Sequence, residues 1–592
     1  MVPIARLFTL AVTWLLSRLS DDTLRRLVAR VFVRTTRSLE AASRDVPAAQ
    51  QDRLLRILRT NADTLFGKQH GFADIQSVEE YRARVPIHTW DDIAPLVDRM
   101  VAGERGVLVA EDVFFYATTS GTTGRRKLIP VTSGFVEECR VATRVLFRTT
   151  FLEMPGIVRG KRLSMRSPKV EPLAPGVEAG SITVALSGGL DGSESAFDAV
   201  PTAVYRVEDF ATRYRLCIRF AAQEHVTLVS AVNPSTLLLF ARTLEEHWQD
   251  SARALEDGGL GEGLVLDEDQ RRQLSARAKK DPEAARRIRD SAEAHGGRPR
   301  LRDLWPDLAG LVCWKGGSAP WYLSRLGASY GELPVLDYGY AASEGCFGAP
   351  LSADGAASVL LPHGHFFELM PEEHVDEVRA GERPTTLLHE AEPGRRYYVV
   401  VTTGAGLYRY DMNDVVEVVG RHHGAPLVVF RQKGGAMASI TGEKVGESHV
   451  VQAMDGAATR AQIHVAGFVA APLLPVGSDD VPAYLLAVDP GDEALSDDDL
   501  ARLAAAFDEA LQEENSEYEA KRGSLRLGPV IAARLPAHAI ARHRQQRVKA
   551  GAPDAHVKIP HVSPDGRLLT ELGLDESAPA LSSRLARVEA AA

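Results

Sequence analysis

The residues best suited to chemistry lie in the segment 116–130, which reads YATTSGTTGRRKLIP. Its glycines let the backbone turn tightly and present successive N–H groups, its hydroxyls supply further donors, and Lys127 supplies a mobile positive charge. Together these groups suit the oxygens of nucleotide phosphates. The Walker pattern does not fit, because two residues separate Gly121 from Gly124 and Lys127 follows three positions later. The alternative is a polar surface hairpin turn, since Gly, Ser and Thr are also ordinary loop residues.

Two more polar segments follow expected strands. The apolar run 308–314 leads into KGGSAP, and the run 335–338 leads into GYAASEG. In open α/β sheets, ligands bind beyond the carboxyl ends of strands, and both segments occupy such positions. Either segment alone would more often be a turn than a site.

A late strand, 408–419, carries Asp414 within the sequence GLYRYDMNDVVEVVG. The Asp414 carboxylate could simply start a turn. A carboxylate at a strand bend also suits a ribose, which offers two hydroxyl donors.

Length and composition narrow the class of protein. A chain of 592 residues is too long for one hydrophobic core, so we expect two or more domains. Its 45% hydrophobic and 25% charged residues are typical of soluble globular proteins. A net charge of -10 argues against a nucleic-acid partner, whose binding would rest on clustered Lys and Arg. The 4 cysteines show no CxxC spacing, so they predict neither a zinc ribbon nor a disulfide framework, and a reducing cytoplasmic location fits.

The N-terminus contains an apolar run, 7–17, flanked by Arg6 and Arg18. It is shorter than the roughly 20 residues that span a bilayer. It resembles a signal-peptide core, but no small-x-small cleavage site follows it. We expect a helix docked on the protein, in preference to one that lies on a membrane surface.

The periodicity along the chain predicts an α/β fold. A helical lead-in covers 22–65, Ser235 caps a helix over 236–248, and 256–300 is a solvated helical excursion of mixed charge. Little can be interpreted between 131 and 180. Strands are expected at 181–187 (SITVALS), 226–232, 308–314, 335–338, 365–369, 397–402, 408–419 and 427–430.

The segment 431–435, RQKGG, has the composition of a hinge. It separates an expected large N-terminal domain of β-sheets layered with α-helices, 1–430, from a smaller mobile α+β domain, 436–592. In the small domain we expect strands at 462–474, 483–488 and 527–533, a helix opened by Ser496, and a basic helix over 540–549. A loose tail is expected from about 576.

The order of these pieces resembles the adenylate-forming superfamily. More closely, the chain is similar to the Gretchen Hagen (auxin-responsive promoter) family of acyl acid amido synthetases, including its bacterial members. The resemblance covers roughly 54–573. It rests on NADTLFGKQHGF, YRARVPIHTWDDIAPLVDRMVAGE, TTSGTTGRRKLIPVT, SAVNPSTLLLF, LEEHW, YGYAASEG, GLYRYDMNDVVEVVG, FRQKGGAMASITGEKVGE and HVKIP.

The resemblance implies a role for each matching residue. ATP phosphates would be held by the loop residues Thr119, Ser120, Gly121, Thr122, Thr123 and Gly124 together with Lys127. Adenine would be flanked by Gly316, Gly317, Ser318, Tyr338, Gly339, Tyr340, Ala341 and Ala342. Ser343 would touch the α-phosphate, Glu344 would hold Mg²⁺, and Asp414 would bind the ribose. Arg431 and Lys433 would lie at the hinge. Lys558 would be the catalytic lysine of the small domain, with Lys444 as the alternative.

The resemblance further implies a monomeric ligase that uses ATP and Mg²⁺. It would first make an acyl-adenylate from a carboxylic acid, and then form an amide with an amino acid or another amine and release AMP. An acyl-CoA or carrier-protein ligase would share the first step, and a nucleotide-binding regulatory protein would share only the fold. Asn413 stands where plant members usually carry glycine, and Gln432 interrupts their usual Arg-Lys pair. The segment 163–204 departs most from the plant pattern, so the acyl acid is not identified.

Overall fold

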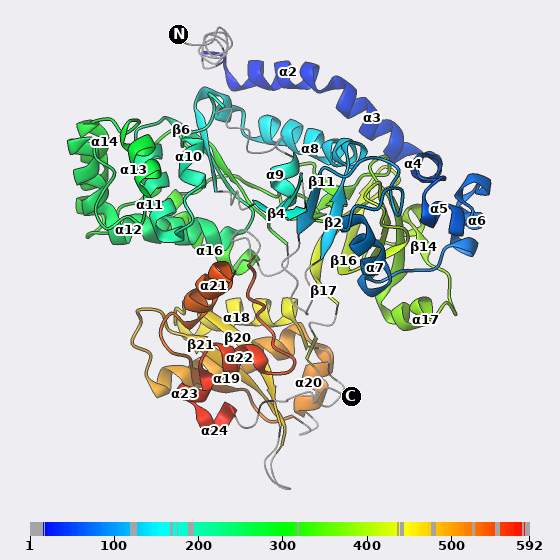
Figure 1. The fold of residues 1–592 in the computed structure, drawn as a ribbon. Helices are drawn as coiled ribbons and strands as arrows, with labels where there is room; N and C mark the ends of the chain where they lie inside the picture. The colour runs from blue at the N-terminus through cyan, green and yellow to red at the C-terminus, as the bar shows by residue number, and fades with distance from the viewer. Residues whose placement is uncertain are drawn as a thin grey trace. The chain divides into compact units, whose positions relative to one another are not determined.

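A computed structural model gives the fold of the chain (Figure 1). It describes residues 16, 18–118, 127–165, 170–174, 176–186, 195–316, 319–434, 437–438, 443, 445–474, 481–523, 527–550, 557–582 and 585. The chain forms two compact units. Unit 1 comprises 1–315, 322–412 and 416–430, and unit 2 comprises 316–321, 413–415 and 431–592. The α/β class expected from the sequence is confirmed, with helices layered on several sheets.

The helical lead-in is confirmed as α2 (Asp21–Val31), α3 (Val33–Arg44), α4 (Val46–Thr60) and α5 (Leu65–Gln69), which follow one another along unit 1 (Figure 1). α2 and α3 pack against α8 (Ser133–Glu153). Asp45 caps α4 by accepting a hydrogen bond from the N–H of Ala48. The Gln50 side chain donates to the carbonyl oxygens of Pro362 and His365 and accepts from the N–H of Phe367, so it fastens α4 to the central sheet. None of the helices in the described part of the chain is long and apolar enough to cross a bilayer.

A seven-stranded sheet forms the centre of unit 1, with the strand order β11-β12-β17-β16-β15-β13-β14. Its strands are β11 (Gly348–Pro350), β12 (Ser358–Leu360), β13 (Phe366–Pro371), β14 (Thr386–Leu387), β15 (Arg396–Thr402), β16 (Tyr410–His422) and β17 (Ala425–Lys433). The expected strands at 365–369, 397–402, 408–419 and 427–430 are therefore confirmed. Their buried side chains join those of α4 and α8 in one hydrophobic core.

A second sheet of unit 1 is parallel, with the order β3-β6-β7-β8. It consists of β3 (Lys161–Met165), β6 (Val226–Ala231), β7 (Gly310–Val312) and β8 (Val335–Leu336). Its core is shared with α11 (Phe210–Ala221), α12 (Pro234–Asp257) and α14 (Pro282–Ala294). The expected strands 226–232, 308–314 and 335–338 are confirmed, and so is the strand-then-helix order.

Other expectations for unit 1 need correction. The run 181–187, expected as a strand, instead contains the short helix α9 (Ile182–Leu186), which packs against α8 and against β1 (Phe115–Thr118). The expected helix 236–248 begins at Pro234 and continues to Asp257, with a kink at His247. The uninterpreted stretch 131–180 holds the 21-residue helix α8 and the strands β4 (Val170–Ala174) and β5 (Val177–Gly180). The excursion 256–300 holds α13 (Glu268–Ser275) and α14, and α14 buries Ile288 instead of remaining fully solvated.

Unit 2 has its own core, built on β20 (Gly467–Leu473), β21 (Ala483–Asp489) and β22 (Ile531–Arg534). The helices α18 (Glu447–Ala461) and α19 (Asp497–Glu514) pack closely, and Ser496 caps α19 as expected. The basic helix is α21 (Ala539–Lys549). Of the tail expected to be loose from about 576, the described residues include α24 (Pro579–Ser582) and Leu585, which is buried in the core of unit 2. The looseness of the rest stays a prediction.

The segment expected as a hinge begins inside a regular strand, because β17 runs on through residues 431–433. Asn413 adopts a φ of 52°, in the left-handed region that glycine and asparagine enter most easily. Its backbone carbonyl accepts from the N–H of Gly434 at 2.7 Å, and its Nδ2 donates to the carbonyl oxygen of Gly434 at 2.8 Å. The left-handed φ gives a physical reason for glycine or asparagine at this position. The hinge at 431–435 itself stays a prediction.

Candidate active site

The Ser/Thr/Gly loop joins two strands of a hairpin. β1 pairs antiparallel with β2 (Leu128–Val131), so that Thr118 lies opposite Leu128. Thr119, Ser120, Gly121, Thr122, Thr123 and Gly124 lie outside the described residues, and their phosphate contacts stay a prediction. The residues on either side of the loop are described, and both contact other segments that the sequence singled out.

Lys127, directly before β2, is held by aromatic side chains. Its Nζ donates to the Tyr410 hydroxyl at 2.9 Å and lies 5.6 Å from the centroid of the Tyr410 ring. The Trp90 ring, at the start of α7 (Trp90–Val101), is 5.9 Å away. A cation over aromatic faces keeps its charge while its position is restricted. Lys127 is half-buried, and the start of β16 positions it.

On the other side of the loop, Thr118 contacts the GYAASEG segment. The Ser343 hydroxyl donates to the carbonyl oxygen of Thr118 at 2.9 Å, and Ser343 and Glu344 are both buried. The structure therefore brings the end of β1 and the Ser343–Glu344 segment together, as the sequence predicted for one site. The Ser343 hydroxyl proton is already used by the backbone, so contact of this O–H with a phosphate requires its rotation.

Asp337 links the two segments that follow β7 and β8. One carboxylate oxygen accepts from the N–H of Lys315 at 2.6 Å, and the other accepts from the N–H of Gly339 at 2.5 Å. Gly339 has a φ of 93°, and a Cβ there would lie 2.3 Å from the carbonyl oxygen of Gly348. Only glycine fits this turn. Because β7 and β8 are parallel neighbours, both segments leave the same edge of the sheet, as expected.

Lys315 places a second lysine side chain near this edge of the sheet. Its Nζ donates to the carbonyl oxygens of Val335 at 2.9 Å and Ala353 at 2.7 Å. Burial lowers the pKa of Lys315, and the nearby Asp337 carboxylate opposes that shift. The Lys315 side chain thus fastens the start of the KGGSAP segment to Val335 of β8 and to Ala353.

The remaining predicted residues are placed singly. Gly316, Tyr338, Tyr340 and Ala341 lie on the segments after β7 and β8, Asp414 is buried on β16, and Arg431 is half-buried on β17. Gly317, Ser318 and Lys444 lie outside the described residues, and of Lys433 only the backbone is described. Lys558 is exposed in unit 2. The nucleotide and catalytic roles of these residues stay predictions.

The sequence missed two residues that organise the site, Tyr410 and Asp337. Both lie inside motifs that had been singled out, GLYRYD and VLDYGY. A carboxylate directly before a Tyr-Gly turn was a signal for Asp337, since aspartate side chains often accept from the backbone two residues on. Tyr410 gave no such signal, because its partner Lys127 lies 283 residues away in the chain.

The other charged residues of the GLYRYDMND segment have structural partners. Arg409 donates from Nε and Nη2 to the Glu368 carboxylate at 2.8 Å each, and from Nη1 to the carbonyl oxygen of Val85 at 2.7 Å. Arg379 pairs with Asp411 at 2.8 Å. The Arg409–Glu368 pair is buried, so removing either partner would leave an uncompensated charge in the core.

Two polar segments leave one edge of the parallel sheet, and the nearby hairpin of β1 and β2 carries Lys127. A solved 2-hydroxyisobutyryl-CoA ligase in the postadenylation state shares the fold, with a TM-score of 0.50 and 14% identity over 89% of this chain and 91% of that chain. The chain belongs to the GH3 family: the model of the GH3 family N-terminal domain matches residues 35–335, that of the central domain 358–433, and that of the C-terminal domain 448–567. The family predicted from the motifs is confirmed.

Curated relatives and a solved structure agree with this family. An indole-3-acetic acid-amido synthetase, GH3.8 of Oryza sativa subsp. indica, is 29% identical over 454 residues, which are 74% of this chain and 74% of the relative. A jasmonoyl–L-amino acid synthetase, JAR4 of Nicotiana attenuata, is 28% identical over 71% of this chain and 74% of the relative. The structure of GH3.15 acyl acid amido synthetase superposes with a TM-score of 0.77, at 20% identity over 92% of this chain and 95% of that one. These matches confirm the predicted enzyme class, an acyl acid amido synthetase.

Proposed function

We propose that the chain activates a carboxylic acid with ATP and transfers the acyl group to an amine, in the first place that of an amino acid. In the first half-reaction, a carboxylate oxygen attacks the α-phosphorus of ATP, and the bond to the bridging oxygen of the β-phosphate breaks. An acyl-adenylate and pyrophosphate result. In the second, the amine nitrogen attacks the acyl carbon, loses a proton, and AMP leaves.

The observation that carries this proposal is the pairing of Thr118 with Leu128, which sets the two ends of the Ser/Thr/Gly segment side by side. Ser343 bonds to Thr118 at one end, and Lys127 bonds to Tyr410 at the other. Phosphoryl-transfer sites work mainly by positioning and by charge neutralisation. A positioned lysine next to a segment rich in N–H and hydroxyl donors suits both tasks. Lys127 neutralises phosphate charge in this scheme. Asp337 holds the segments after β7 and β8, which would contact the adenine. Asp414 accepts hydrogen bonds from the ribose hydroxyls.

The donor set also fits Mg²⁺ bound together with nucleotide phosphates. Glu344 supplies a carboxylate beside the loop, and Mg²⁺ typically takes one or two carboxylates plus phosphate oxygens. When bound, the ion adds positive charge against the phosphates. Lys558 is proposed as the lysine of unit 2 that acts on the substrate, with Lys444 as the alternative.

ATP–pyrophosphate exchange tests the first half-reaction. A panel of aryl, indolyl and aliphatic acids should contain at least one that supports exchange, and Lys127→Ala should reduce that exchange at least a hundredfold. Lys161→Ala is the matched control, because Lys161 pairs with Glu224 at the surface of unit 1 and should leave exchange unchanged. Exchange at the wild-type rate in Lys127→Ala would refute the role of this lysine. Absence of exchange with every acid would favour a nucleotide-binding regulatory protein.

The acceptor distinguishes an amido synthetase from an acyl-CoA ligase, which a fold neighbour makes the second candidate. With the active acid in hand, amino acids should accelerate AMP release and give an amide detectable by mass spectrometry. AMP release that responds to coenzyme A and not to amino acids would contradict the amide proposal.

We also propose a cytoplasmic location. The described cysteines Cys139, Cys217, Cys313 and Cys346 are all free and buried, and burial raises the pKa of Cys217 to about 12. Unreactive thiols of this kind need no oxidising compartment. Fractionation of the native host cell with antibody detection would test this location.

A further inference from the structure

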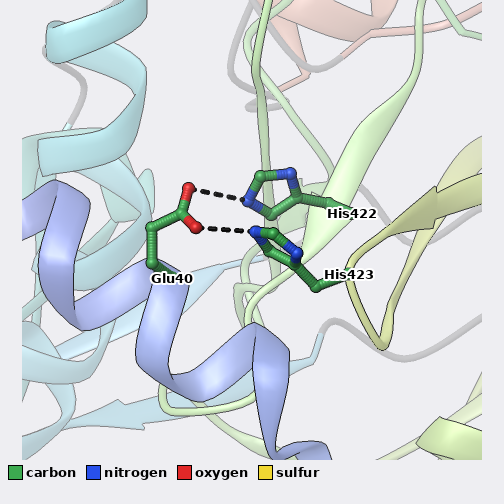
Figure 2. Close-up of side chains that lie close together, drawn as sticks. All are labelled: Glu40, His422 and His423. Carbon is green, nitrogen blue, oxygen red and sulfur yellow. Dashed lines mark hydrogen bonds and ion pairs between the residues drawn. The ribbon is translucent and has the colours of Figure 1, made fainter.

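Two histidines and a glutamate meet on unit 1, at the end of β16 opposite Tyr410. Glu40 belongs to α3, His422 is the last residue of β16, and His423 begins the turn to β17 (Figure 2). Glu40 and His423 are 383 positions apart in the chain. The proposed adenylation reaction uses none of these three residues.

The ligand atoms of the cluster converge. The Nε2 of His423 lies 2.6 Å from one Glu40 carboxylate oxygen, and the Nε2 of His422 lies 3.5 Å from the other. All three groups offer a ligand atom within 4.8 Å of one another. Figure 2 shows both rings directing these nitrogens at the carboxylate. A tetrahedral ion with bonds of about 2.0–2.1 Å keeps its ligands about 3.4 Å apart, so small side-chain rotations suffice to admit one.

The backbone already holds the two elements together. The N–H of Gly424 donates to the carbonyl oxygen of Ser43 at 2.7 Å, which joins the turn after β16 to the last turn of α3. His423 has a φ of 53°, so its backbone is fixed in a turn conformation. Ligands on prejoined elements lose little freedom when an ion binds.

Two arginines also lie near the cluster. Arg44 lies 3.4 Å from the Glu40 carboxylate and Arg148 also acts on His422, so two positive charges oppose an ion here. The Arg44 side chain is 68% exposed and can move away, which leaves a site of moderate affinity.

We propose that Glu40, His422 and His423 form a binding site for a divalent transition-metal ion, with Zn²⁺ as the best fit, that ties α3 to the turn between β16 and β17. Two imidazoles and one carboxylate are a zinc ligand set that leaves a fourth position for water. Imidazole ligands suit Zn²⁺, Ni²⁺ and Cu²⁺, whereas Mg²⁺ takes oxygen ligands. The site is therefore separate from the one proposed at Glu344.

Calorimetric titration of ZnCl2 into the full-length chain, freed of any tag and without nucleotide, tests the proposal. We expect one site with a micromolar Kd. His422→Gln and His423→Gln should each weaken it at least about tenfold, and His225→Gln should not, because His225 pairs only with the surface Asp307 among the described residues. The proposal would be overturned by a wild-type chain without a site tighter than about 100 μM. It would also be overturned if His422→Gln and His423→Gln bound zinc as tightly as the wild-type chain.

Cobalt gives a second readout that does not depend on affinity. Co²⁺ added to the wild-type chain should produce the strong visible absorption of a tetrahedral site, and the double variant His422→Gln, His423→Gln should lack it. The apo forms should melt at the same temperature, which shows that the variants fold. Identical spectra of the wild-type chain and the folded double variant would overturn the site.

Discussion

Removing a single oxygen atom, in Tyr410→Phe, should slow the proposed adenylation without unfolding the chain. The Tyr410 hydroxyl accepts the 2.9 Å hydrogen bond from the Lys127 Nζ, and the Tyr410 ring centroid lies 5.6 Å from the same nitrogen. Phenylalanine keeps the ring, and so the cation–π contact, but removes the acceptor. In the proposed mechanism Tyr410 positions Lys127, and Lys127 binds the phosphates.

The size of the effect follows from the kind of bond that is lost. A hydrogen bond from a charged donor contributes roughly 1.5–3 kcal/mol when it is buried. Lys127 is half-buried, so water can replace part of it, and we expect a loss of about 1–2 kcal/mol. That corresponds to an approximately 5–30-fold lower kcat/KM for ATP in pyrophosphate exchange. Lys127→Ala removes the charge itself and should cost much more.

Pyrophosphate exchange at varied ATP measures kcat and KM separately, and scanning fluorimetry reports folding. Tyr397→Phe is a matched control, because the hydroxyl of this buried tyrosine of β15 accepts from the backbone N–H of Glu392, away from Lys127, and should leave exchange unchanged. In the Lys127→Ala background, Tyr410→Phe should cause no further loss. Wild-type exchange in folded Tyr410→Phe, or an equal loss with and without Lys127, would refute the reasoning.

Three further predictions concern stability, each measured by urea unfolding. Asn413→Ala should lower the free energy of unfolding by about 2 kcal/mol, because alanine disfavours the φ of 52° and the hydrogen bond from the Asn413 side chain to Gly434 is lost. Asn413→Gly should lower it by no more than about 1 kcal/mol, because glycine adopts this φ easily. Equal losses in the two variants would contradict the role of φ. Arg409→Lys should cost about 3 kcal/mol, since lysine cannot form the two parallel bonds to the buried Glu368, and a loss below about 1 kcal/mol would show that the pair matters little. Burial lowers the pKa of His363 to about 4, so between pH 6.5 and 4 the unfolded chain binds a proton that the folded chain does not, and stability should fall across that window by up to about 3 kcal/mol. His363→Asn should reduce the loss of stability between pH 6.5 and pH 4. An unchanged loss in this variant would assign it to other titrating groups.

Local pattern explains which elements were predictable. Apolar, β-branched runs such as those of β6 and β15 indicate a buried strand, and Ser496 before an acidic turn specifies the start of α19. α8 escaped prediction because its buried face includes polar residues, Glu138, Thr149 and Thr150, which blur the helical period. The run SITVALS is rich in β-branched residues, yet it forms α9 where it packs on β1 and α8, so tertiary contact overrode propensity.

Two described parts of the tail, α24 and Leu585, show what composition leaves out. Its Ala- and Ser-rich composition indicates a loose segment, but Leu585 is only 4% exposed and belongs to the core of unit 2. One well-placed apolar side chain is enough to hold a short segment on a core. Composition averages over such positions and so cannot reveal them.

The sequence by itself determined the family and the α/β class, because ordered motifs and strand-length apolar runs are local features of the chain. The segments for a nucleotide stay a prediction from the same motifs. Only the tertiary structure decided which side chains meet. It brought Tyr410 to Lys127 and Glu40 to the two histidines, and it placed Ser343 against Thr118. These partners lie between 225 and 383 positions apart in the chain, and residues so distant become neighbours only through the packing of whole sheets and helices.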